Sequence, residues 1–205
     1  MIKNYEHIAI IPARKNSIGY PKKNRIFFNH TKEFLRKIKW FKKIYLSSDD
    51  LWFEKHCKIN NYQFLKRDKK LCKSNTSIKK VMVEIVRQKK IDDNCILWLI
   101  YIPLIPKSKK LFEKGKSIIQ KKGIKSICGF TKVETHPYLT WYSKNNKIYK
   151  YCKNNIYRRQ DLPKAMMHNH IISAFKCGEL KYLNDELINK NTKPIFVKNK
   201  IKEID

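Results

Sequence analysis

A short loop near the start of the chain concentrates cationic side chains around a glycine. The loop spans residues 14–24, follows the apolar run 8–13, and contains Gly19 together with Arg14, Lys15, Lys22 and Lys23. Cations around a flexible backbone are suited to binding a triphosphate. The Walker pattern Gly-x-x-x-x-Gly-Lys-Ser/Thr is absent, as is the dinucleotide pattern Gly-x-Gly-x-x-Gly. The loop therefore leaves two interpretations open, phosphate binding and an ordinary solvated surface loop.

Carboxylates and thiols offer a second kind of chemistry. Asp49 and Asp50 follow an apolar segment, where an acidic pair either caps the start of a helix or binds a metal ion. Six cysteines are spread along the chain without a Cys-x-x-Cys pair, and no histidine stands at zinc-finger spacing from them. We expect scattered reduced thiols rather than a disulfide framework or a zinc site.

Alternating apolar segments indicate the elements that must position these side chains. Ile8–Ala13 is a continuous apolar run, typical of a strand buried on both faces. Further strands are predicted at 43–47, 62–65, 95–101 and 125–130, and helices at 31–40, at 51–58, after Asn75-Thr76-Ser77, and from 111 to near Gly123. This alternation predicts an α/β fold with a three-layer, mostly parallel open sheet, whose first strand lies at or near the centre.

The pattern changes from residue 138 onward. Short apolar segments with turns at Asn145-Asn146 and Asn154-Asn155 predict a β-rich insertion at about 138–168 rather than a second domain. We therefore expect residues 1–205 to form a single domain. In open α/β sheets, ligands bind outside the carboxyl ends of the strands, so the loop after the first strand is the predicted site.

The net charge of +30 dominates the composition. A basic surface favours polyanions such as nucleic acid or anionic lipid. However, the basic residues are nearly all lysines spread along the chain, whereas nucleic-acid readers concentrate arginine and aromatics in one element. We expect a solvated basic surface without a specific nucleic-acid partner, with polyanion binding as the alternative. The absence of a long apolar run and of a signal-peptide pattern predicts a cytoplasmic protein without a membrane partner.

Five collinear motifs resemble those of the acylneuraminate cytidylyltransferase family, over residues 7 to about 176. The loop matches the pattern Pro-Ala-Arg-x-x-Ser-x-Gly-x-Pro-x-Lys-Asn, and Ile44–Asp50 is similar to the family's second strand and acidic turn. The other matches are Phe64–Arg67 with Leu71 and Asn75-Thr76-Ser77, then Glu134–Pro137, then Arg158–Pro163 with the later Asn169. The resemblance implies a Rossmann-like nucleotidyltransferase domain.

The resemblance also implies an activity, the transfer of CMP from CTP to a sialic-acid-like nonulosonic acid (a nine-carbon 2-keto acid sugar) with release of pyrophosphate. It assigns Arg14 and Lys23 to the triphosphate as catalytic residues. Further assignments are Ser17, Asn24, Arg67 and Ser77 to the nucleotide, and His136, Arg159, Gln160 and Asn169 to the sugar. For His136, which precedes a proline, a loop hydrogen-bonding role is the alternative. The family pattern further implies Mg²⁺ at Asp205 and a homodimer formed through the insertion.

The sequence departs from the family pattern at several places. Ile18 replaces a phosphate-loop lysine, Leu99–Pro106 is apolar where the family has hydrogen-bonding side chains, and the segment between Phe28 and Phe41 is shorter. The family's second metal-binding aspartate has no counterpart two residues after Asp205. Weak metal binding and weak or absent synthetase activity are therefore expected. A non-catalytic relative that still binds nucleotide, and a basic polyanion-binding protein, are the alternative functions.

Overall fold

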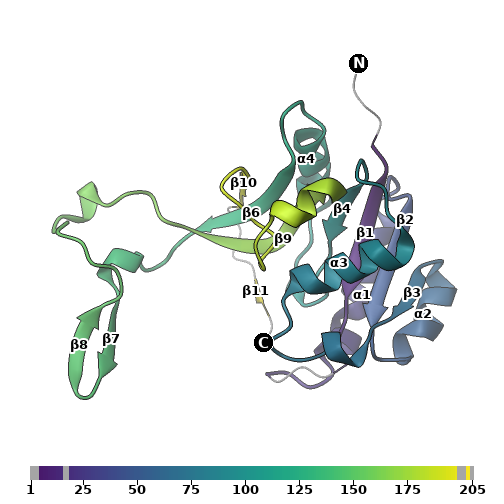
Figure 1. The fold of residues 1–205 in the computed structure, drawn as a ribbon, viewed down its shortest axis with the longest axis horizontal. Helices are drawn as coiled ribbons and strands as arrows, with labels where there is room; N and C mark the ends of the chain where they lie inside the picture. Colours follow the sequence, from purple (N-terminus) through teal and green to yellow (C-terminus); the bar gives the residue numbers. More distant parts are fainter. Residues whose placement is uncertain (1–4, 16–18, 198–201, 204–205) are drawn as a thin grey trace.

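The computed structural model describes residues 5–15 and 19–197, together with the backbone of residues 202–203. Its centre is a seven-stranded sheet in the order β10-β6-β9-β4-β1-β2-β3. The strands are β1 (His7–Pro12), β2 (Lys43–Ser48), β3 (Gln63–Lys66), β4 (Ile96–Leu99), β6 (Ser126–Lys132), β9 (Met166–Lys176) and β10 (Lys193–Phe196). Neighbouring strands are parallel except where β9 pairs with β4 and β6. This confirms the predicted mostly parallel open sheet (Figure 1).

Burial on both faces sets the place of β1 in the sheet. Ala9 and Ile11 pack into the core on one face, and Ile8 and Ile10 pack into the core on the other, all at no more than 1% exposure. A strand with two apolar faces fits only the interior of a sheet that is covered on both sides. β1 accordingly pairs with β2 on one side and with β4 on the other, as predicted for the first strand.

Helices cover both faces of this sheet and give the predicted three layers (Figure 1). They are α1 (Lys23–Arg36), α2 (Trp52–Asn60), α3 (Ile78–Lys89), α4 (Lys109–Ile119) and the 3₁₀ segment η4 (Cys177–Tyr182). Phe28, Phe53 and Phe112 from α1, α2 and α4 are fully buried on one face, each contributing roughly 1.5–3 kcal/mol. Val81 and Met82 of α3 are buried on the other face. Within the described residues, no helix has both the length and the apolarity to cross a bilayer.

The first helix begins earlier than the sequence pattern predicted. We expected a helix at 31–40, but α1 runs from Lys23 and is capped at Lys37. Its buried face continues from Asn24 through Phe28 to Leu35 at helical spacing, which the polar residues between them obscure in the sequence. The early start shortens the loop after β1, so the first turn of α1 lies at the end of this loop.

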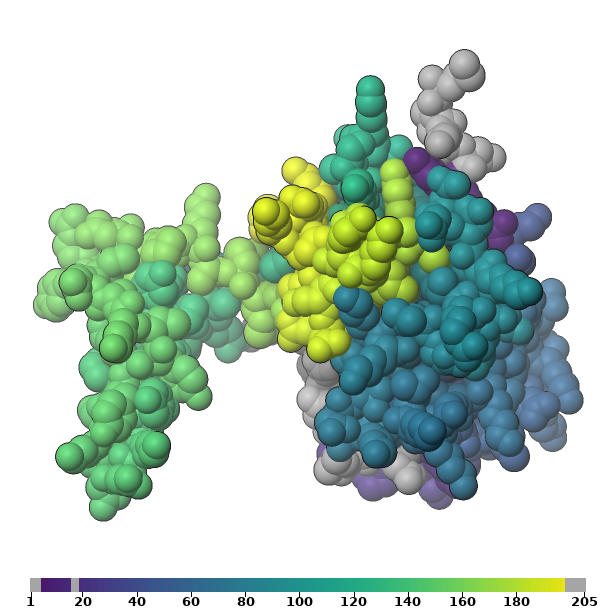
Figure 2. All heavy atoms as spheres, viewed as in Figure 1, coloured from purple at the N-terminus to yellow at the C-terminus, as the bar shows by residue number. Residues whose placement is uncertain are grey.

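Residues 133–165 form an arm that stands away from the sheet (Figures 1 and 2). β6 and β9 extend as a two-stranded neck, which ends where Lys132 pairs with Met166. Two short 3₁₀ segments, η2 (Pro137–Leu139) and η3 (Arg159–Asp161), lie beyond the neck. The arm therefore joins the sheet only through the neck.

A hairpin of β7 (Trp141–Lys144) and β8 (Lys147–Lys150) occupies the end of the arm. Asn145 and Asn146 form its turn with φ of 51° and 59°, the left-handed conformation that two-residue hairpin turns need. The first predicted turn is thus confirmed. The second, at Asn154-Asn155, is a side-chain turn and not a hairpin: Asn154 Oδ1 accepts from the Ile156 amide (3.2 Å), and Nδ2 donates to the Tyr138 carbonyl (3.2 Å).

All six cysteines lie in the described residues and none forms a disulfide, which confirms the prediction of free thiols. Burial raises the pKa of Cys57, Cys128 and Cys177 to about 12. Thiols with such pKa values stay protonated at neutral pH, so these three act as apolar core residues.

His7 places a titratable ring inside the core at the start of β1. The Trp98 indole Nε1 donates to His7 Nδ1 at 3.0 Å, and the Trp40 ring packs against the imidazole at a centroid distance of 5.1 Å. Burial, with a smaller contribution from the charge of Lys116, lowers the His7 pKa to about 4. The fold therefore holds His7 in its neutral form.

We predict that this histidine makes the fold sensitive to acid. A lowered folded-state pKa contributes stability that is complete above the unfolded pKa of about 6.5 and declines as the pH falls toward 4. Between pH 7.5 and pH 4.5, His7 accounts for a loss of about 2–3 kcal/mol in unfolding free energy. Denaturant unfolding at both pH values should show a smaller loss for His7→Gln than for the wild type. The control His30→Gln, at an exposed site, should lose as much unfolding free energy as the wild type. If His7→Gln also loses as much as the wild type, His7 is not the source of the acid sensitivity.

Candidate functional site

Four loops meet at the edge of the sheet where the parallel strands β1, β2, β3 and β4 end. They carry Arg14, Asp49, Arg67 and Tyr101. β9 runs in the opposite direction, so its first residues lie at this edge as well. We call this region the carboxyl edge. It is the place where open α/β sheets bind ligands, and the basic loop lies there as predicted.

The end of β2 holds the first half of the basic loop. The Ser48 hydroxyl donates to the Ala13 carbonyl, directly after β1. Two residues further along the loop, the Lys15 amide donates to Oδ1 of Asp49, the residue after Ser48, at 2.7 Å. Because Ser48 is fully buried, the loop leaves the sheet in a fixed direction.

The first turn of α1 holds the other side of the loop. Asn24 is buried, and its Nδ2 donates to the Arg14 carbonyl at 2.9 Å. Lys22 turns the chain into the helix with a left-handed φ of 59° and provides no side-chain cap. The amino-terminal end of a helix carries partial positive charge, so α1 begins with its positive end beside Arg14 and Lys23.

Asp50 joins the end of β2 to α1 through an ion pair. Its carboxylate accepts from Arg25 Nε at 2.6 Å and from Arg25 Nη2 at 2.7 Å, with the Asp50 side chain only 5% exposed. The hydrogen bonds from Arg25, aided by the Trp52 amide, lower the pKa of Asp50. Asp50 is therefore ionised and engaged with the protein, one residue before the cap of α2 at Leu51.

Arg67 is a buried cation without a paired carboxylate. It is 8% exposed, and its guanidinium donates from Nε to Ser47 Oγ (3.2 Å) and from Nη2 to the Ser47 carbonyl (2.8 Å). Among the described residues, no carboxylate lies within ion-pair distance, although Asp49 and Arg14 are near enough to interact electrostatically. Burial lowers the Arg67 pKa, because the charged form has lost its water. An anion at this edge would meet a desolvated guanidinium.

Other residues predicted to bind nucleotide or metal lie nearby or outside the described part. Ser77 caps α3, its hydroxyl accepting from the Lys80 amide at 3.4 Å. Ser17, Ile18 and Asp205 fall outside the described residues. Within those residues no group of three or more His, Cys, Asp or Glu side chains is arranged to hold a metal ion.

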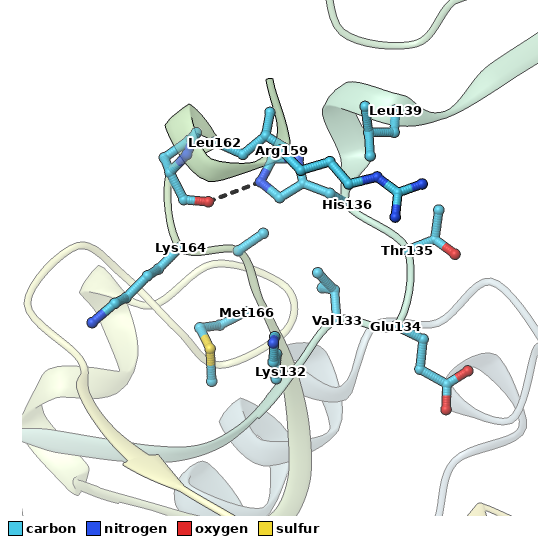
Figure 3. Close-up of a pocket in the computed structure, with 12 residues that line it drawn as sticks. Lys132, Val133, Glu134, Thr135, His136, Leu139, Arg159, Leu162, Lys164 and Met166 are labelled. Carbon is cyan, nitrogen blue, oxygen red and sulfur yellow. Dashed lines mark hydrogen bonds between the residues drawn. The ribbon is translucent and has the colours of Figure 1, made fainter. Parts of the chain in front are cut away.

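A cavity of about 650 Å³ opens between the neck and the arm (Figure 3). Its cationic or ionisable lining residues are Lys132, His136, Arg159 and Lys164, against the single carboxylate of Glu134. Two of the four predicted sugar-binding residues, His136 and Arg159, therefore share one cavity. Gln160 does not line it, and Asn169 lies on β9 with its side chain against Gly129.

Both ring nitrogens of His136 are engaged by the backbone of the arm. Nδ1 accepts from the Tyr138 amide at 3.1 Å, and Nε2 lies 2.9 Å from the Pro163 carbonyl (Figure 3). Because a carbonyl only accepts, Nε2 carries the proton and the ring is neutral. The structure thus gives His136 the loop hydrogen-bonding role, and its contact with a sugar stays a prediction.

Some residues at the carboxyl edge were missed by the sequence reasoning. Tyr101 and His170 lie with ring centroids 5.4 Å apart, and His168 lies at 5.4 Å on the other side of His170. The alternation His-x-His at the start of a strand would have placed both histidines on one face, had β9 been predicted. The ion pair between Arg25 and Asp50 left no local signal, since its members are far apart in the chain.

Comparisons with known proteins agree with this architecture. No protein-family model and no curated protein matches the chain. A solved CMP:2-keto-3-deoxy-manno-octonic acid synthetase complexed with CTP matches 95% of this chain and 90% of its own, with a TM-score of 0.65 and 13% identity. A 4-diphosphocytidyl-2C-methyl-D-erythritol synthase matches 96% and 90% (TM-score 0.63, 9% identity), and that of Anaerococcus prevotii DSM 20548 matches 95% and 88% (0.58, 14%). The likeness shows that the chain has the nucleotidyltransferase fold.

We predict that the Arg25–Asp50 pair stabilises the fold at the carboxyl edge. Asp50→Asn removes the charge opposite a half-buried guanidinium and should lower the unfolding free energy by about 1.5–3 kcal/mol at neutral pH. The matched control is Glu33→Gln, which breaks an exposed ion pair with Arg36 on the same helix and should cost about 0.5 kcal/mol or less. Urea unfolding of both variants provides the measurement. Equal losses would show that Asp50 acts as an ordinary surface charge.

Proposed function

We propose that this chain is a CTP-dependent nucleotidyltransferase that transfers CMP to a sialic-acid-like 2-keto acid sugar. The observation that carries the proposal is the carboxyl edge, where a tethered basic loop lies beside the buried Arg67, which forms no ion pair with a carboxylate of the described residues. A triphosphate supplies the negative charge that this arrangement lacks. The similar structures named above are themselves a CMP-sugar synthetase bound to CTP and two diphosphocytidyl synthases, which favours CTP as the nucleotide.

The basic loop and α1 are the proposed triphosphate site. Arg14 and Lys23 neutralise the phosphates, and Ser17 is a further predicted nucleotide-binding residue. Asn24 contributes by holding the Arg14 carbonyl, which fixes the loop. Arg67 directly follows β3, and Ser77 directly precedes α3. Both are proposed to lie near the base and ribose. Positioning and charge neutralisation are what a protein contributes to phosphoryl transfer.

The proposed reaction needs little covalent participation by the protein. The anomeric hydroxyl of the sugar attacks the α-phosphorus of CTP, a new oxygen–phosphorus bond forms, and the bond to pyrophosphate breaks. Negative charge grows on the pyrophosphate as it leaves, and Arg14 and Lys23 stabilise it there. Preorganised cations of this kind lower the barrier because they need no rearrangement during the reaction.

Mg²⁺ is the proposed cofactor, with Asp205 as its predicted ligand. Glu203 stands two residues before Asp205, so the chain ends with the acidic-x-acidic spacing that the resemblance implies, with glutamate in the first position. The backbone of β11 (Lys202–Glu203) pairs with β5 (Leu104–Ile105), in the segment that follows β4. Carboxylate oxygens are the ligands Mg²⁺ prefers, and the bound ion would neutralise phosphate charge. Weak metal binding at Asp205 stays a prediction, which the Mg²⁺ dependence of the rate tests.

The acceptor sugar is proposed to be held from the arm. Arg159 in the cationic cavity, with Gln160 and His136 nearby, provides charge suited to a sugar carboxylate, and Asn169 approaches from β9.

Hairpin side chains such as Trp141 (53% exposed) and Ile148 (71%) support the further proposal of a homodimer formed through the arm. Sedimentation velocity would show that dimer as a species of twice the chain mass. Cytoplasmic location remains a prediction from the sequence.

Calorimetry can separate a nucleotide site from diffuse electrostatics. Arg14→Ala and Lys23→Ala should each weaken CTP binding by roughly 1–3 kcal/mol, because each removes a charge-assisted contact to phosphate. Lys190→Ala, a change outside the site, should have little effect. The polyanion alternative predicts equal losses at all three positions, a steep salt dependence, and no preference for CTP over ATP.

A pyrophosphate-release assay tests the activity itself. CTP, Mg²⁺ and a panel of nonulosonic acids should give turnover, and omission of any one component should abolish it. Glu203→Gln and Asp205→Asn should each raise the Mg²⁺ concentration needed for half-maximal rate, because each withdraws one carboxylate ligand. CTP binding without turnover on any sugar would favour the non-catalytic alternative.

A further inference from the structure

His170 lies in an irregular part of β9 at the carboxyl edge. Cys128 of β6 pairs with Ser173, but the next residue, Gly129, pairs with Asn169, so residues 170–172 bulge out of the β6–β9 ladder. Bulges re-aim side chains and are frequent next to active sites. Here the bulge turns His170 against Tyr101, which follows β4.

One ring contact and two electrostatic interactions link His170 to the proposed nucleotide site. The Tyr101 ring lies 5.4 Å from the imidazole of His170, and Tyr101 is also close enough to Arg67 to interact with its charge. Arg67 in turn feels the charge of Arg14. His170 therefore stands between the nucleotide residues of β1 and β3 and the neck that leads to the arm. Under the proposed function, an acceptor sugar held by the arm reaches the nucleotide from this side.

Nδ1 of the His170 ring makes no structural hydrogen bond within the described ranges of the chain. This atom is enclosed and has no partner among the described residues. His7 and His136 differ, since Trp98 donates to one ring and the backbone engages both nitrogens of the other. A histidine without a structural partner at a ligand-binding edge is available for a substrate.

We propose that His170 is the general base of the reaction. The proposal rests on the nucleotidyl transfer proposed above. The imidazole of His170 accepts the proton of the sugar's attacking hydroxyl as its oxygen bonds to the α-phosphorus and pyrophosphate departs. The imidazolium then returns the proton to solvent. The reaction requires no oxidant, reductant or additional reactant.

The groups around His170 keep its ring neutral and ready to accept a proton. Burial, and secondarily the neighbouring His168, lower the His170 pKa to about 4. Tyr101 on the β4 side is the other titratable group against the ring, the Cys128 thiol of β6 bonds to the carbonyl of the preceding Asn169, and Glu186 Oε2 lies 3.9 Å from His168 Nε2. The polyanionic triphosphate stabilises a nearby imidazolium, so nucleotide binding should raise this pKa toward the working pH.

The test is the pH dependence of kcat in the pyrophosphate-release assay. In the wild type, kcat should fall at low pH as His170 becomes protonated. His170→Gln should lower kcat by about 10²–10⁴-fold and abolish that acid limb, while CTP binding measured by calorimetry is retained. His168→Gln should move the acid limb to higher pH, because it removes a like charge. His30→Gln, at an exposed site on α1, should leave the profile unchanged.

The outcomes separate this inference from the function it rests on. Turnover by the wild type, with an unchanged kcat and pH profile in His170→Gln, would overturn the role of His170 and leave the transferase intact. Failure of the wild type to release pyrophosphate with any acceptor would overturn both. Should His170→Gln not fold, the shift of the acid limb in His168→Gln decides, since a purely structural role for His170 leaves that limb in place.

Discussion

Burial of β1 on both faces is the constraint on which the rest of the structure depends. Ile8 to Ala13 expose almost no surface, so helices must cover the sheet above and below this strand. That requirement places α1 and α3 on opposite faces and puts β2 and β4 on either side of β1. The polar chain after Ala13 therefore leaves the sheet at the carboxyl edge, where Ser48 and Asp49 at the end of β2 hydrogen-bond to it.

The balance of charge at this edge is what points to an anionic ligand. Asp50 is engaged by Arg25 and the Asp49 carboxylate by a backbone amide, so neither neutralises Arg67 directly. A buried guanidinium bonded to neutral oxygens is poorly compensated, because its desolvation is offset only by dipoles. A bound phosphate would supply the opposite charge. The total of +30 says little about this, since most of it comes from lysines spread along the chain.

The three histidines His7, His136 and His170 show how environment decides the role of one residue type. His7 is enclosed by tryptophans and serves the core. His136 has both nitrogens bonded to backbone and shapes the arm. His170 lies at the carboxyl edge, and its enclosed Nδ1 has no hydrogen-bond partner in the described part of the chain, which is why we propose that it meets the substrate. Burial lowers the pKa of His7 and of His170 alike, so only the hydrogen-bond partners distinguish a core histidine from a candidate catalytic one.

The order of strands and helices up to β6, the central place of Ile8–Ala13 and the basic loop after it were determined by the sequence itself, because burial leaves a local period in the chain. The later strands β9 and β10 were not predicted. The same periodicity misplaced the start of α1, where polar residues interrupt the apolar face. Only the tertiary structure decided that Asp50 pairs with Arg25 and that Tyr101 meets His170. Such contacts join residues that are far apart in the chain. Their distances depend on how the elements pack, and a local sequence pattern does not contain that information.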